Sequence, residues 1–301
     1  MATPEELRYY SSQSRVTDPG QESALLGGLP SSIAGLRRAA QGLVAHYRGD
    51  DPLAHGVSPE RMAEIDTRYA EAMLARLAEL DDGGLVAPRP LERRLVGCCR
   101  DFTVLFLTMA RAMGIAGRAR VGFASYFFPG YFVDHVVAEV WDAGTGRWRL
   151  VDPQLHEPHT APSGGQVDPM DVSPEDFLIG GEAWRRCRSG LADPGTFVVS
   201  PFVDVAELRG WPYLRHNVVL DLAFLNKVET LLWDSWGLLE QPDGGEASVE
   251  QVDSVAALTA APAPDLARLQ AVFADPSLAV PATVVSYDPL GGPPRTVTLK
   301  V

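Results

Sequence analysis

The stretch Gly97-Cys98-Cys99-Arg100-Asp101-Phe102 decides the fold, because it places a cysteine where a helix should begin. Apolar residues continue from Phe102 to Met113 at helical spacing, and Gly114 follows as a stop signal. The unpaired N–H groups and the dipole of a helix N-terminus favour an anion at the first turn. The stretch therefore predicts a buried helix whose first turn can hold a thiolate.

Two further stretches supply an imidazole and a carboxylate on expected strands. They are Asp134-His135-Val136-Val137-Ala138-Glu139-Val140-Trp141 and Trp148-Arg149-Leu150-Val151-Asp152-Pro153, and residues 142–146 between them have hairpin composition. His135 precedes the turn and Asp152 follows it by comparable distances, so both can lie on one face of an antiparallel pair. We expect the helix that starts at Cys99 to pack against that face.

A thiol, a base and an orienting acid are the parts of a cysteine nucleophile. The imidazole of His135 would take the thiol proton of Cys99 and return it to the leaving group. Asp152 would hold the ring in the required tautomer and stabilise the imidazolium. The three residues together indicate acyl transfer through a thioester.

These stretches resemble the transglutaminase-like core of the papain-like superfamily. The patterns Gly-x-Cys-x-Asp-Phe, His-x-x-x-Glu-Val-Trp and Trp-x-x-Val-Asp-Pro carry the resemblance over residues 93–154. Residues 111–122 resemble its helix-to-strand passage, with Ala116-Gly117 where the family has Pro-Ala. Residues 9–30 and 205–240 look similar to uncharacterised bacterial proteins that carry this core. The resemblance implies an α+β, papain-like fold with a helix-borne Cys on an antiparallel sheet, and Cys99, His135 and Asp152 as catalytic residues.

The adjacent thiols have to be told apart. The family pattern aligns Gly97, Cys99 and Asp101, which leaves Cys98 at a variable position. Neighbouring residues on a helix point about 100° apart, so only one thiol can face His135. We interpret Cys99 as the nucleophile, and Asp101 as a residue that caps the first helical turn.

The most aromatic part of the chain lies just before the predicted base. Tyr126, Phe127, Phe128 and Tyr131 flank Pro129-Gly130, which predicts a turn. These four side chains could line an acyl channel and bind substrate. They could equally cover the core beneath a loop, and the sequence leaves both interpretations open.

Other residues favour structural roles. Arg100, Arg118 and Arg120 could bind a substrate carboxylate, but solvated or paired structural arginines fit better. The run His156-Glu157-Pro158-His159 has histidines at a metal-like spacing, but its proline breaks the helix that such a pair needs. Cys187 has basic neighbours and no local base, so we interpret it as structural. We expect no metal and no cofactor.

Composition narrows the class of partner. The 301 residues carry a net charge of −13, which argues against nucleic acid and anionic membranes as partners. No apolar run approaches a membrane span, and the first residues lack the pattern of a signal peptide. Three cysteines make no disulfide framework, so we expect a reducing, cytoplasmic location. The expected substrate is a peptide or a small amide or acyl compound.

The expected domains are an N-terminal arm on the surface (1–30), a catalytic domain (31–240) and a C-terminal extension of two short helices and a hairpin (241–301). Outside the core, the patterns predict helices and turns that are listed here in chain order: helices behind Ser31-Ser32 and Ser58-Pro59, a loop at 154–172, helices near 174–187 and 217–239, a turn at 242–245, and a hairpin of 282–287 with 295–300.

The sequence leaves the acceptor of the acyl group open. Water would make the protein a peptidase or amidase, whereas an amine would make it an amide-forming transferase. A non-catalytic module that binds a peptide in the same cleft is an alternative. An acyltransferase that takes a carrier-bound thioester in a biosynthetic pathway is another.

Overall fold

The computed structural model describes residues 2–157, 159–162, 164–241 and 246–300. The turn expected at 242–245 lies outside the described residues. Two compact units share the chain: unit 1 comprises 1–119, 137–157 and 168–171, and unit 2 comprises 120–136, 158–167 and 172–301. The boundaries expected from the sequence, at 30/31 and 240/241, stay predictions.

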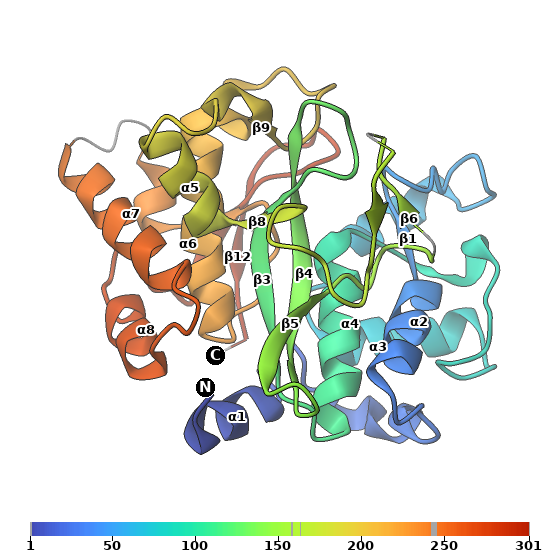
Figure 1. Cartoon of the computed structure of the whole chain (residues 1–301). Coiled ribbons are helices and arrows are strands. Elements are labelled where there is room, and N and C mark those ends of the chain that lie inside the picture. Colours follow the sequence, from blue (N-terminus) through green and yellow to red (C-terminus); the bar gives the residue numbers. More distant parts are fainter. Residues whose placement is uncertain (1, 158, 163, 242–245, 301) are drawn as a thin grey trace. The chain divides into compact units, whose positions relative to one another are not determined.

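Unit 1 is built around one buried helix. Its helices are α1 (Pro4–Ser11), α2 (Ile33–Leu43), α3 (Ala70–Leu80) and α4 (Cys99–Ala112). Helix α4 packs against the other three (Figure 1). Every residue of α4 from Cys99 to Arg111 is buried, so its first turn is fixed by packing as well as by its own hydrogen bonds.

A short parallel pair leads the chain into α4. Strand β1 (Val44–His46) pairs with β2 (Leu95–Gly97) in the register Val44↔Leu95 to His46↔Gly97. All three residues of β2 are buried, and Cys98 is the only residue between this strand and α4. The position of β2 therefore sets where Cys99 begins its helix.

The central sheet carries the predicted hairpin. Its strand order is β5-β4-β3-β8, with β9 also paired to β4. The strands are β3 (Gly117–Ala124), β4 (Phe132–Asp142), β5 (Arg147–Val151), β8 (Phe177–Ile179) and β9 (Phe197–Val198). The hairpin of β4 and β5 runs in the register Ala138↔Val151 to Asp142↔Arg147, as the turn composition predicted. The boundary between the two units crosses β3 and β4.

Unit 2 gathers helices around α6 (Gly210–Leu225), which is buried from Asn217 to Leu225. It packs against α5 (Gly180–Arg188), α7 (Glu246–Thr259) and α8 (Leu266–Phe273) (Figure 1). The remaining strands are β6 (His159–Thr160), β7 (Gln166–Val167), β10 (Asp234–Ser235), β11 (Thr283–Ser286) and β12 (Arg295–Thr298). Strands β11 and β12 form the expected terminal hairpin. Two helices precede it as expected, but α7 has 14 residues and only α8, with 8, is short.

The structure differs from the sequence-based expectations at several elements. The segment expected as a surface arm contains α1, whose Tyr10 is fully buried against the ring of Trp148. The helix expected from Pro59 onward is a 3-10 helix, η2 (Pro59–Asp66), followed by a break and then α3. Met113, expected in the core, is 43% exposed because α4 has already ended.

Two further differences lie after the catalytic stretches. The helix expected near 174–187 is strand β8 followed by α5. The helix expected at 217–239 starts at Gly210 and ends at Leu225, and β10 follows. The loop expected at 154–172 contains the small β6–β7 pair. None of the described helices is long and apolar enough to span a membrane.

We predict that Gly122→Ala destabilises the sheet by about 3 kcal/mol, because the added Cβ would lie 2.2 Å from the carbonyl oxygen of Leu178 in β8. Gly42→Ala is the matched control. Among the described residues, nothing apart from the nearby backbone of α2 itself lies within 4 Å of its Cβ position, so alanine should stabilise the protein by about 0.5 kcal/mol. Urea unfolding measures both changes, and equal stabilities of the two variants would contradict the prediction.

Candidate active site

Cys99 is the first residue of α4 and is 5% exposed. Its position confirms the sequence-based expectation that this cysteine lies at the start of a helix. A helix N-terminus stabilises a negative charge through its N–H groups and dipole. The local backbone therefore favours the thiolate form that nucleophilic chemistry needs.

Asp101 caps this helix start, as predicted. Its Oδ2 accepts a hydrogen bond of 2.8 Å from the backbone N–H of Cys98, and its Oδ1 accepts one of 2.9 Å from Arg100. Burial raises the pKa of the Asp101 carboxyl, while Arg100 and the Cys98 N–H oppose that shift. A Cβ on Gly97 would lie 2.7 Å from this carboxylate, so the glycine leaves room for the cap.

Cys98 differs from Cys99 in its local chemistry. It is the N-cap residue of α4 and is 3% exposed. A hydrogen bond with Cys99 and burial raise the pKa of the Cys98 thiol well above its ordinary value, and the charge of Asp101 acts in the same direction. Cys98 is therefore held as a neutral thiol at neutral pH.

Asp152 follows β5 directly and is fully buried. Its Oδ1 accepts hydrogen bonds from the backbone N–H groups of Gln154 (2.8 Å) and Leu155 (3.3 Å). Its own N–H donates to the carbonyl of Pro169 at 2.8 Å. These bonds fix the carboxylate at the end of the strand, in the turn-starting geometry that aspartate favours before proline.

His135 lies in β4, is 2% exposed, and is surrounded by aromatic rings. Its ring centroid is 5.0 Å from Phe127, 6.0 Å from Tyr126 and 6.3 Å from Phe177, with near-perpendicular ring planes. Edge-on packing of this kind restricts rotation of the imidazole. The surroundings suit a base that must keep one orientation.

The aromatic segment is divided in its exposure. Tyr126 is 1% exposed, which fits the interpretation that it covers the core, and Phe127, Phe128 and Tyr131 are half-buried. Phe128 packs edge-on against Phe202, with centroids 5.4 Å apart. The Tyr131 N–H donates to the Phe128 carbonyl and closes the predicted turn. Whether these four side chains bind substrate stays a prediction.

The three arginines have structural partners. Arg100 pairs with Asp101, and Arg120 makes a bidentate pair with Asp221 of α6 at 3.0 and 2.9 Å. Arg118 pairs with Glu6 and Glu139 and stacks on two aromatic rings. All three arginines are buried, so the structural interpretation of these residues is confirmed.

The remaining candidates also have structural surroundings. A ring nitrogen of His156 hydrogen-bonds with Gln41, and Nε2 of His159 hydrogen-bonds with the Tyr126 carbonyl. Among the described residues, no three His, Cys, Asp or Glu side chains gather in a way that could hold a metal ion. Burial and the charge of Asp193 raise the pKa of Cys187 to about 11, which outweighs its basic neighbours.

Cys99 and Asp152 belong to unit 1, and His135 belongs to unit 2. Each of the three is buried at the kind of position that the sequence indicated: a helix start, a strand end and a strand interior. The convergence of the three side chains stays a prediction.

Two contacts near His135 were not found from the sequence. Phe177 packs on its ring from β8, in a segment expected as helix. The hydroxyl of Tyr213 donates a 2.6 Å hydrogen bond to Asp134, the neighbour of His135 in β4. Both partners lie more than 40 positions away along the chain, and no local pattern links them to His135.

The fold is α+β, with a buried cysteine at the start of a central helix and a buried histidine in the sheet. Residues 60–153 match the family model of the transglutaminase-like superfamily. The chain therefore contains a transglutaminase-like superfamily domain, and the matched range includes Cys99, His135 and Asp152.

No curated protein matches the chain. Two solved structures resemble it slightly. One is a protein of Cytophaga hutchinsonii that carries the provisional name cysteine protease, with 16% identity and a TM-score of 0.32 over 59% of this chain and 50% of that one. The other is the transglutaminase of red sea bream, with 14% identity and a TM-score of 0.36 over 58% of this chain and 35% of that one. The chain thus spans half or less of the length of these two proteins.

We predict that Asp101→Ala lowers the free energy of unfolding by about 3 kcal/mol, because it removes the cap of α4 and the ion-pair partner of the buried Arg100. Asp265→Ala removes an exposed cap from α8, and should cost only about 1 kcal/mol. Urea denaturation of both variants measures the difference. A loss for Asp101→Ala no larger than the loss for Asp265→Ala would contradict the assigned role.

Proposed function

We propose that the protein transfers acyl groups through an S-acyl intermediate on Cys99, and so cleaves or forms an amide bond in a peptide or small amide. The observation that carries the proposal is the buried thiol at the first position of α4, inside the range that matches the transglutaminase-like superfamily. The proposed base is His135 and the proposed orienting acid is Asp152.

The hairpin register supports this assignment. Ala138 pairs with Val151, so the next position along the hairpin matches Val137 with Asp152. Val137 and His135 are two residues apart in β4, and side chains with that spacing leave a strand on the same face. A hydrogen bond between His135 and Asp152 is therefore part of the proposal.

In the proposed reaction, the Sγ of Cys99 attacks the carbonyl carbon of the substrate while His135 accepts the thiol proton. N–H groups at the start of α4 can stabilise the oxyanion of the tetrahedral intermediate. The carbon–nitrogen bond then breaks, and the amine leaves with the proton that His135 returns. Water or a second amine attacks the thioester, regenerates the thiol and releases an acid or a new amide.

The neighbouring thiol provides an internal control. We predict that Cys99→Ala lowers turnover by a factor on the order of 10⁴ or more, with the fold retained. Cys98→Ala should change turnover by no more than about tenfold, because it removes one hydrogen bond to Cys99 and leaves the proposed nucleophile in place. Steady-state kinetics on an amide donor measure both variants. Loss of turnover in Cys98→Ala with activity retained in Cys99→Ala would reverse the assignment.

Incubation of the protein with acyl donors, with and without primary amines, tests which acceptor is used. Mass spectrometry distinguishes the free acid from the new amide, and free acid alone at high amine concentration would exclude the transferase. Iodoacetamide tests catalysis itself. A non-catalytic binding module should show no fast, pH-dependent labelling of Cys99 near neutrality.

A further inference from the structure

One ion-pair network in unit 1 contacts the segment that leads into the proposed nucleophile. Arg61 and Glu64 lie in η2, three residues apart, and their side chains are 15% and 11% exposed. The guanidinium of Arg61 donates from Nε to Oε1 of Glu64 at 2.8 Å and from Nη2 to Oε2 at 3.0 Å. Such a forked pair holds both side chains in one geometry.

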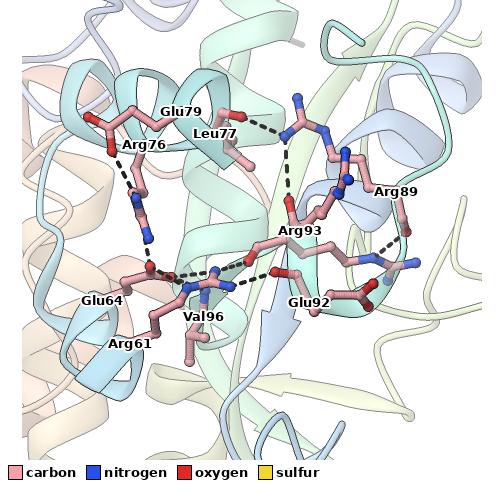
Figure 2. A network of polar contacts seen from close by, with 10 residues as sticks. Arg61, Glu64, Arg76, Leu77, Glu79, Arg89, Glu92, Arg93 and Val96 are labelled. Carbon is pink, nitrogen blue, oxygen red and sulfur yellow. Dashed lines mark hydrogen bonds and ion pairs between the residues drawn. The ribbon is translucent and has the colours of Figure 1, made fainter. Parts of the chain in front are cut away.

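The same two side chains bind backbone groups before Cys99. Arg61 donates to the carbonyl oxygens of Glu92 (2.5 Å) and Arg94 (2.6 Å), and Oε2 of Glu64 accepts the N–H of Val96 at 2.9 Å (Figure 2). Three alternate residues of the chain are thus held by one ion pair. Cys99 follows three residues after the last of them.

The backbone groups of Arg94 and Val96 that bind this ion pair lie at the edge of β2 and of the residue before it. Backbone groups of successive residues in a strand point to opposite edges. The carbonyl of Gly97 accepts from the Tyr47 N–H on the side of β1, so the groups of Arg94 and Val96 point to the other edge. The Arg61–Glu64 pair satisfies that edge in place of a neighbouring strand.

We infer that Glu64, held by Arg61, is a positioning residue for Cys99. It fixes β2, and through β2 the start of α4, so that the thiol keeps its place against the N–H groups of the first helical turn. The inference rests on the proposed function, because it concerns the residue that we propose as nucleophile. Glu64 itself has no chemical step.

The charge state of Glu64 fits this role. Burial alone would raise the pKa of its carboxyl, but hydrogen bonds from Arg61, the Val96 N–H and Arg76 bring it below its ordinary value. The stability that Glu64 contributes is therefore present above the unfolded pKa of about 4.3, and is lost as the pH falls through the lower folded value. The anchor is intact at neutral pH.

Glu79 offers a matched control. It accepts a 2.8 Å hydrogen bond from Arg76, which also donates to Oε1 of Glu64 at 2.9 Å (Figure 2). Glu79 is thus a second carboxylate of the same network, and its side chain is 65% exposed. Its hydrogen bond to Arg76 lies outside the segment 92–96.

The experiment compares Glu64→Ala, Arg61→Lys and Glu79→Ala with the unmodified protein. Iodoacetamide labelling of Cys99 is followed by mass spectrometry from pH 5 to pH 10, and hydrogen exchange is followed at the amides of residues 95–101. Arg61→Lys keeps the charge but cannot bind two carbonyls and a carboxylate at once, and it serves if Glu64→Ala does not fold.

We expect Cys99 to be labelled about tenfold more slowly at pH 7 in Glu64→Ala and in Arg61→Lys. The pH midpoint of labelling should rise toward the ordinary thiol pKa of about 8.5. Amides of residues 95–101 should exchange about tenfold faster, while those of β11 and β12 stay unchanged. Glu79→Ala should match the unmodified protein. If the substitutions only made Cys99 more accessible, labelling would become faster. Slower labelling therefore indicates that Cys99 has lost its positioning, rather than that the structure around it has loosened.

Unchanged labelling midpoints and unchanged exchange in both Arg61 and Glu64 variants would overturn the inference and leave the proposed function standing. Slow, pH-independent labelling of Cys99 in the unmodified protein would instead contradict the proposed function and the positioning of a nucleophile with it. The exchange rates would then still decide whether Glu64 anchors β2.

Discussion

The capped start of α4 is the constraint on which the rest of unit 1 depends. The Asp101 carboxylate binds the Cys98 N–H, pairs with Arg100 and fits closely against Gly97. This cap fixes the end of β2 and the beginning of the helix in one arrangement, and the side chain of Cys99 leaves from that point. A helix buried along its length could tolerate a misplaced thiol only by repacking its neighbours.

The sequence was most informative where a local pattern is sufficient to define structure. The start of α4, the β4–β5 hairpin and the terminal hairpin were all predicted, because capping residues, turn residues and hydrophobic period act within a few positions. The same reasoning chose Cys99 over Cys98, and that choice stays a prediction. The burial of His135 and Asp152 fits their predicted positions on neighbouring strands.

What the sequence did not reveal depends on contacts between distant segments. The stretch from Asn217 to Leu239 is rich in apolar residues on both sides of Leu225, so their pattern did not show that the helix ends there, two residues before the left-handed backbone of Lys227. The 3-10 helix η2 carries Arg61 and Glu64, which bind residues some 30 positions away. Contacts at that separation leave no sign in the local pattern of the sequence. The ring of Phe177 reaches His135 from a segment whose own pattern suggested a helix.

The central claim is that Cys99 and His135 act as one unit, and the titration of the His135 imidazole tests it most directly. NMR of the ring nitrogens gives the pKa of His135 in the unmodified protein and in Cys99→Ala. A thiolate beside the ring stabilises the imidazolium, so removal of the sulfur should lower the pKa of His135 by about one unit or more. The same pKa in both proteins would show that the two groups do not interact, and would contradict the account.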